Sequence, residues 1–99
     1  MEEIKIKENI YRIRKMNAIE VLALQSQINF ETAEDSKRTY ETILENLEVN
    51  VSGDKWLPVK EKKQNVYYPS EVENDYLTIK KLIKFMLDFV REVFQKSDV

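Results

Sequence analysis

Residues 76–96, with the sequence YLTIKKLIKFMLDFVREVFQK, decide the fold. Apolar side chains recur there every three or four residues, which predicts an amphipathic helix with one face in the core. At about 1.5 Å per residue this helix is roughly 30 Å long, the width of a small domain. Ser70 with Glu73 has the spacing of a capping box, and Asp75 is an alternative start, so we place the helix at about 75–96. Its predicted core stripe is Ile79, Leu82, Ile83, Met86, Phe89, Val90, Val93 and Phe94.

Two shorter helices are predicted upstream. Asn17, followed three residues later by Glu20, has capping-box spacing and starts the first. The residues from Ala18 to Ile28 are apolar almost all round, so we expect this helix to be buried on more than one side. A second helix is predicted at about 32–47, and Phe30 in the joining segment should pack beneath it. Its apolar face is Ala33, Tyr40, Ile43, Leu44 and Leu47.

The remaining segments alternate in the manner of strands. Residues 3–7 and 10–15 predict two strands joined by a tight turn at Glu8-Asn9, or one bent strand with a bulge. Residues 48–51 and 55–59 flank the only glycine turn, and Pro58 puts the second of these strands at an edge or end. Residues 60–65 should be a solvated loop, and 66–68 a short extended piece. The outline is ββααββα, a single α+β domain over residues 1–99 with a small antiparallel sheet and about three helices.

Composition excludes several kinds of chemistry. The 99 residues include no cysteine and no histidine, so disulfides, thiolate metal sites and the commonest general base are absent. No apolar run approaches the roughly 20 residues needed to cross a bilayer. The start of the chain is acidic and alternating, unlike a signal peptide, so we expect a cytoplasmic protein without membrane association.

Catalytic and metal-binding patterns are weak. Glu41 and Glu45 share one face of the second predicted helix, which is typical of a solvated surface. Glu31, Glu34 and Asp35 lack the alternating spacing and the glycine of a calcium loop. We therefore predict no catalytic residue, no metal site and no cofactor, and hence no enzyme.

A nucleic-acid interface is the next alternative. The predicted hairpin carries a basic strip, Lys5, Lys7, Arg12, Arg14 and Lys15, with Tyr11 interleaved. Neighbouring residues of a strand point to opposite faces, so Tyr11 should be core while Arg12 faces solvent. The net charge is −2, whereas nucleic-acid binders carry a basic excess. We therefore expect no nucleic-acid partner.

Two apolar groups suit a protein-binding surface. Phe85 and Leu87 lie beyond the main stripe of the last helix, where they either fill the margin of the core or form a second apolar face. Such a face would dock a partner helix or a second copy of the chain. Trp56, Tyr67 and Tyr68 cluster near the predicted edge strand, and either fill the core under a loop or add an aromatic anchor.

From about Ile10 to Ser97 the chain resembles small tail assembly chaperones of long-tailed phages and prophages of Gram-positive bacteria. The matching residues are mostly packing and loop residues. They are Tyr11-Arg12-Ile13-Arg14-Lys15-Met16 before a helix that begins Ala18-Ile19-Glu20, then Glu45-Asn46, Trp56-Leu57-Pro58-Val59-Lys60, Tyr68-Pro69 and Val93-Phe94-Gln95-Lys96-Ser97.

The resemblance implies a specific role. Such chaperones bind the long, helical tape-measure protein, keep its apolar helices soluble, and are displaced as tail tube protein polymerises around it. They are absent from the finished virion, and many have a longer, frameshifted second form. The family pattern assigns no binding residues, so the placement of a binding face on Phe85, Leu87 and Trp56 depends on amphipathicity alone. The alternatives are a structural tail or head–tail component that stays in the particle, and an RNA-binding or regulatory domain.

Overall fold

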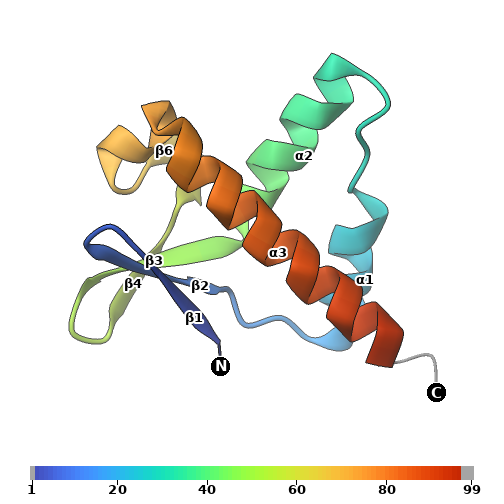
Figure 1. Cartoon of the computed structure of the whole chain (residues 1–99), viewed down its shortest axis with the longest axis horizontal. Coiled ribbons are helices and arrows are strands. Elements are labelled where there is room, and N and C mark those ends of the chain that lie inside the picture. Colours follow the sequence, from blue (N-terminus) through green and yellow to red (C-terminus); the bar gives the residue numbers. More distant parts are fainter. Residues whose placement is uncertain (1, 97–99) are drawn as a thin grey trace.

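A computed structural model describes residues 2–96 of the chain, with side chains as far as Val93; the side chain of Phe94 and residue Ser97 lie outside that range. Helix α3 (Tyr76–Lys96) crosses the whole molecule. Figure 1 shows it running diagonally, with a sheet on one side and helices α1 (Ala18–Ser26) and α2 (Ala33–Glu45) on the other. The predicted α+β fold with a long C-terminal helix is confirmed.

Asp75 supplies the start of α3. Its carboxylate accepts hydrogen bonds from the backbone N–H of Thr78 (3.1 Å) and from the Thr78 hydroxyl (2.8 Å). The other proposed start, Ser70 with Glu73, is wrong. Ser70–Asn74 form a separate 3₁₀ helix, η1, in which the Ser70 hydroxyl faces the Glu71 carboxylate (3.4 Å) and caps no backbone group.

The main sheet is antiparallel and has four strands in the order β1-β2-β3-β4. A tight turn, and not a bent strand, joins the first two strands, and Lys7 adopts a positive φ of 56° in it. The turn is at Lys7-Glu8, one residue before the predicted Glu8-Asn9, since Asn9 already belongs to β2. Gly53, with φ of 51°, turns the chain between the last two strands, where the left-handed backbone favours glycine. Pro58 ends an edge strand, as predicted. The bounds are β1 Glu3–Ile6, β2 Asn9–Ile13, β3 Leu47–Ser52 and β4 Lys55–Pro58.

One face of this sheet joins α2, α3 and η1 in a single core. Tyr11 is buried and Arg12 is on the other face of β2, as strand parity predicts. Leu47 belongs to β3 and not to α2, which ends at Glu45. The residues of the core that are essentially inaccessible are Tyr11, Ile43, Leu47, Val49, Val59, Val72, Leu82 and Met86.

Helix α1 is less buried than its composition predicts. The capping box at Asn17 is present: Glu20 N–H donates to the Asn17 side chain (2.9 Å), and Asn17 N–H donates to the Glu20 carboxylate (3.1 Å). However, Ile19 is 73% exposed and Leu22 55%, because α1 lies at the periphery and contacts the core through only one side. The prediction of burial on several sides is therefore wrong. So is the packing of Phe30 beneath α2, since Phe30 is exposed beside Tyr40.

Residues 60–65 are only partly a solvated loop. Lys60–Glu61 form strand β5, which pairs with β6 (Val66–Tyr67) in a second, two-stranded sheet. Lys60 is buried, and its ammonium donates to the Glu45 carboxylate of α2 at 3.0 Å. Burial alone would lower the pKa of Lys60, but the hydrogen bond and charge of Glu45 raise it above its usual value.

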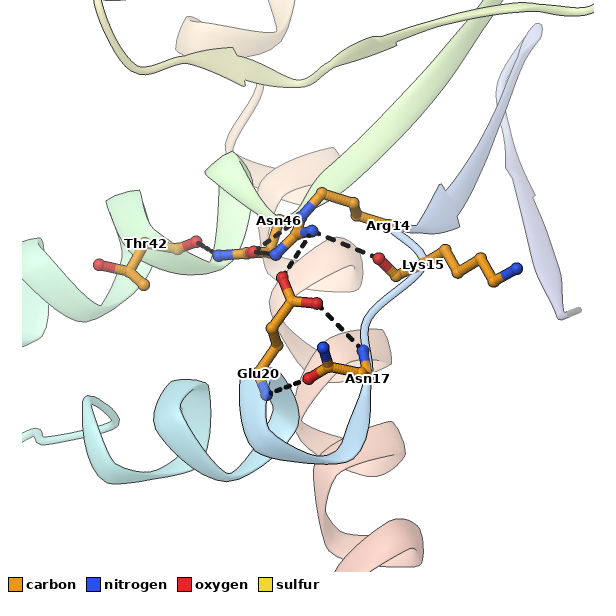
Figure 2. Close-up of polar contacts among 6 residues, drawn as sticks. All are labelled: Arg14, Lys15, Asn17, Glu20, Thr42 and Asn46. Carbon is orange, nitrogen blue, oxygen red and sulfur yellow. Dashed lines mark hydrogen bonds and ion pairs between the residues drawn. The ribbon is translucent and has the colours of Figure 1, made fainter.

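Arg14 connects three elements just after β2 (Figure 2). Its guanidinium donates to the Asn46 side chain from Nε (3.1 Å) and Nη2 (2.9 Å), and to the Glu20 carboxylate from Nη1 (3.1 Å). Asn46 caps the end of α2 and in turn donates to the Thr42 carbonyl (2.8 Å). Because Glu20 closes the capping box of α1, one planar side chain holds the start of α1, the end of α2 and the end of β2 together.

We expect Arg14→Ala to lower the free energy of unfolding by about 1–2 kcal/mol, because it leaves charged and amide partners without donors. Arg14→Lys should recover only part of this loss, since an ammonium lacks the planar fork. Urea denaturation provides the measurement. Arg38→Ala is the control, because Arg38 pairs with α2 carboxylates only at the exposed surface and its loss should cost less than about 0.5 kcal/mol. Equal effects of Arg14→Ala and Arg38→Ala would contradict the role of Arg14.

Asp75 should give a defined dependence of stability on pH. A hydrogen bond from the Lys7 ammonium (2.5 Å), together with those from Thr78, lowers the pKa of Asp75 from 3.8 to about 2. A carboxyl with a depressed pKa in the folded state stabilises the fold above its unfolded pKa, and that stabilisation disappears as the pH falls through its folded pKa.

The melting temperature of Asp75→Asn should therefore lie several degrees below that of the native chain near neutral pH. The difference should shrink between pH values of about 4 and 2 and vanish below. Thermal melts across this range measure it, with Asp54→Asn in the exposed turn after β3 as the matched control. A difference that stays constant down to the lowest pH would show that the charge of Asp75 is not involved.

Candidate protein-binding groove

One side of α3 forms the floor of an open groove. Ile79, Ile83 and Leu87 follow one another at intervals of four residues, so they form a continuous apolar row along the helix. A parallel row, Tyr76, Lys80, Lys84 and Asp88, borders it, and Arg91 closes its far end. With Tyr40 of α2 as the opposite wall, these residues line a hollow of about 650 Å³, which we call the α2–α3 groove.

Tyr40, the α2 residue that lines the groove, has an aromatic neighbour, Phe30, in the segment between α1 and α2. The Phe30 and Tyr40 rings lie 5.6 Å apart and are tilted by 45°, a favourable aromatic pair. Both are more than 40% exposed, and Tyr76 on the opposite wall is 66% exposed. Exposed aromatic side chains that border an apolar row are the kind of surface that binds another protein.

The border row is rich in cations. The Lys80 ammonium lies 6.0 Å from the centre of the Tyr76 ring. Asp88 is shared, accepting from Lys84 at 2.8 Å and from Arg91 at 3.0 Å. The hydrogen bond from Lys84 lowers the pKa of Asp88, so this carboxyl is ionised near neutral pH. The groove therefore has three cations and one anion along an apolar floor.

Of the five predicted binding residues, only Leu87 lines this groove. Phe85, Tyr67 and Tyr68 are half-buried and pack against the core, which is the position that core filling predicts. Trp56 lies on β4, where the Arg12 guanidinium stacks 3.9 Å from the centre of its ring. Phe85 and Leu87 cannot share one face, because residues two apart on an α-helix are separated by about 200°.

Apart from Leu87, no groove residue was predicted as a binding residue; those missed are the charged residues Lys80, Lys84, Asp88 and Arg91 and the apolar or aromatic residues Tyr40, Tyr76, Ile79 and Ile83. Tyr40, Ile79 and Ile83 have helical spacing with core residues, so the pattern placed them in the core; Tyr76 marks only the start of α3. The sequence shows that the apolar stripe of α3 is two rows wide, but not which of its residues stay part-exposed. Of these two adjacent rows, 82-86-90 is buried throughout, whereas in 79-83-87 only Ile83 is buried and Ile79 and Leu87 are part-exposed.

The other candidate sites are occupied by structural contacts. Glu45 is paired with buried Lys60, and the basic strip is largely neutralised: Lys7 contacts Asp75, Arg12 contacts Glu48 at 2.8 Å, and Arg14 contacts Glu20. Within residues 2–96, no three His, Cys, Asp or Glu side chains are close enough to hold a metal ion. A smaller hollow beside Arg14 is lined by side chains that already bond to one another.

No helix in the described part of the chain combines the length and apolarity needed to span a bilayer. No family model, curated protein or solved structure matches the chain.

Phe85→Asp distinguishes a core position from a surface position. We expect it to lower the free energy of unfolding by about 2 kcal/mol or more, because it places a carboxylate against the core. Tyr76→Ser should change it by less than about 0.5 kcal/mol, since Tyr76 is largely exposed. Urea denaturation of both variants tests this. An unchanged midpoint for Phe85→Asp would return Phe85 to the candidate binding surface.

Proposed function

We propose that the protein is a phage tail assembly chaperone that binds amphipathic helices of a tape-measure protein in the α2–α3 groove. The observation that carries this proposal is the apolar floor Ile79–Ile83–Leu87, which lies between Tyr40 of α2 and a charged border. Ile83 is buried in this floor, and Ile79 and Leu87 are part-exposed. The resemblance of the sequence to such chaperones supplies the identity of the partner. The groove supplies the physical means of holding it.

The shape of the groove suits a helix. Its lining on α3 extends from Tyr76 to Arg91, about four helical turns or roughly 22 Å. Side chains spaced by four residues form ridges, and the ridges of a second helix pack into the channel beside them. An amphipathic partner would place its own residues at i, i+3, i+4 and i+7 along the floor.

The groove also suits reversible binding. Its floor is only one helix face wide, so a single contact should resemble small, transient interfaces below about 1,200 Å². Hydrophobic contact is non-directional and tolerates different sequences in successive tape-measure segments. Several copies bound along one tape-measure chain would shield it, while each copy remains displaceable by polymerising tube protein.

Co-expression with a tape-measure fragment tests the proposal. The native chain should keep the fragment in the soluble fraction, and Tyr40→Ser/Tyr76→Ser should lose most of this effect because both groove walls are removed. Leu77→Ser is the matched control: Leu77 is 67% exposed on the same helix but does not line the groove. Circular dichroism should be the same for all three proteins. Equal precipitation of the fragment with and without the native chain would refute the proposal.

A structural tail component is the second candidate, and one observation favours it. The outer side of α1 presents exposed Ile19 and Leu22, a second apolar surface through which copies of the chain could associate. Analytical ultracentrifugation separates the two functions. A chaperone should sediment as a small species by itself, whereas stable rings or tubes of the isolated chain would favour the structural component.

A further inference from the structure

The charge of the α2–α3 groove departs from that of the rest of the chain. Over 99 residues, acidic side chains outnumber basic ones by 18 to 16. Among the residues that line the groove the balance is reversed, with Lys80, Lys84 and Arg91 against Asp88 alone. An apolar groove with a cationic border in an acidic protein indicates that the border contributes to the choice of partner.

These cations are available to a partner. Lys84 and Arg91 are exposed and share the single carboxylate of Asp88. Lys80 stands over the Tyr76 ring, and no described carboxylate lies within 4.0 Å of its ammonium. By comparison, three basic side chains near the sheet, Lys7, Arg12 and Arg14, each contact a carboxylate that no other described cation shares.

The cations also have a regular position. Lys80 and Lys84 are one helical turn apart, in the row beside the apolar floor. A helix that lies along the floor would therefore pass one of its flanks over both ammonium groups. Carboxylates spaced three or four residues apart on that flank would meet them in turn, and lysines there would meet like charge.

We infer that the groove selects helices whose apolar stripe is bordered by Asp or Glu, and discriminates against helices bordered by Lys or Arg. This inference rests on the proposed function, since it assumes that a helix occupies the groove. Exposed ion pairs add little affinity individually, so the charges decide between partners and the apolar floor provides the binding. The discrimination should therefore weaken as salt screens the border.

Binding of three synthetic helical peptides tests the inference. Each has about 18 residues and the same leucine stripe, and the stripe is flanked by Glu, Gln or Lys. Fluorescence anisotropy with the full chain should show the Glu peptide binding about tenfold more tightly than the Lys peptide at about 50 mM salt, with the ratio approaching one at about 500 mM.

Lys80→Glu/Lys84→Glu should reverse the order of the Glu and Lys peptides. Lys62→Glu/Lys63→Glu, with the same change of charge in the exposed loop between β5 and β6, is the matched control and should retain most of the native order.

The failures can be told apart. Equal binding of all three peptides at low salt would overturn the charge selection and leave the groove as a helix-binding site. No binding of any peptide would overturn the proposed function as well. If the isolated chain is a dimer that Lys80→Glu/Lys84→Glu dissociates, and no peptide competes, a second copy occupies the groove and the inference is wrong.

Discussion

The rest of the structure packs around one buried row of α3, formed by Leu82, Met86 and Val90. Leu82 and Met86 are completely inaccessible, and the sheet, α2 and η1 all contribute to the core around them. This row commits one side of a 21-residue helix to the interior. In the adjacent row Ile83 is also buried, but Ile79 and Leu87 remain only half-buried because no described element covers them fully.

Two residues, Arg14 and Thr39, make hydrogen bonds that hold α2 in its position beside this row. Arg14 holds the end of α2 against the start of α1 and the end of β2. Thr39 is buried on α2. Its hydroxyl accepts a hydrogen bond from Asn29 N–H (2.9 Å) and donates one to the Asn29 carbonyl (2.8 Å). The segment between α1 and α2 is thereby held against α2, and Phe30, the next residue, lies beside Tyr40. The hydrogen bonds of Thr39 thus help to place Phe30 against Tyr40, the α2 residue that lines the groove.

The basic side chains near the sheet and those along the groove make different contacts. Near the sheet they bind carboxylates that have structural roles: the Lys7 ammonium donates to Asp75, whose carboxylate caps the start of α3. Along the groove they border an apolar surface and share one carboxylate. Every buried side-chain polar atom of the described residues has a hydrogen-bond partner, so the polar groups that remain accessible are at the surface, and the charged ones beside the groove are mostly cationic.

The sequence by itself determined much of the local structure: the three helices, the capping box at Asn17, one of the two proposed starts of α3, a tight turn placed within one residue, and the edge strand ended by Pro58. Each depends on residues within a few positions of one another, so periodicity and capping chemistry suffice to predict it. Only the tertiary structure decided which apolar side chains are covered. Phe85 packs against the core, Ile19 is left exposed, Lys60 is buried beside Glu45, and the 79-83-87 row borders a groove. Burial depends on which distant elements lie over a residue, and the spacing of apolar residues along one helix carries no information about that.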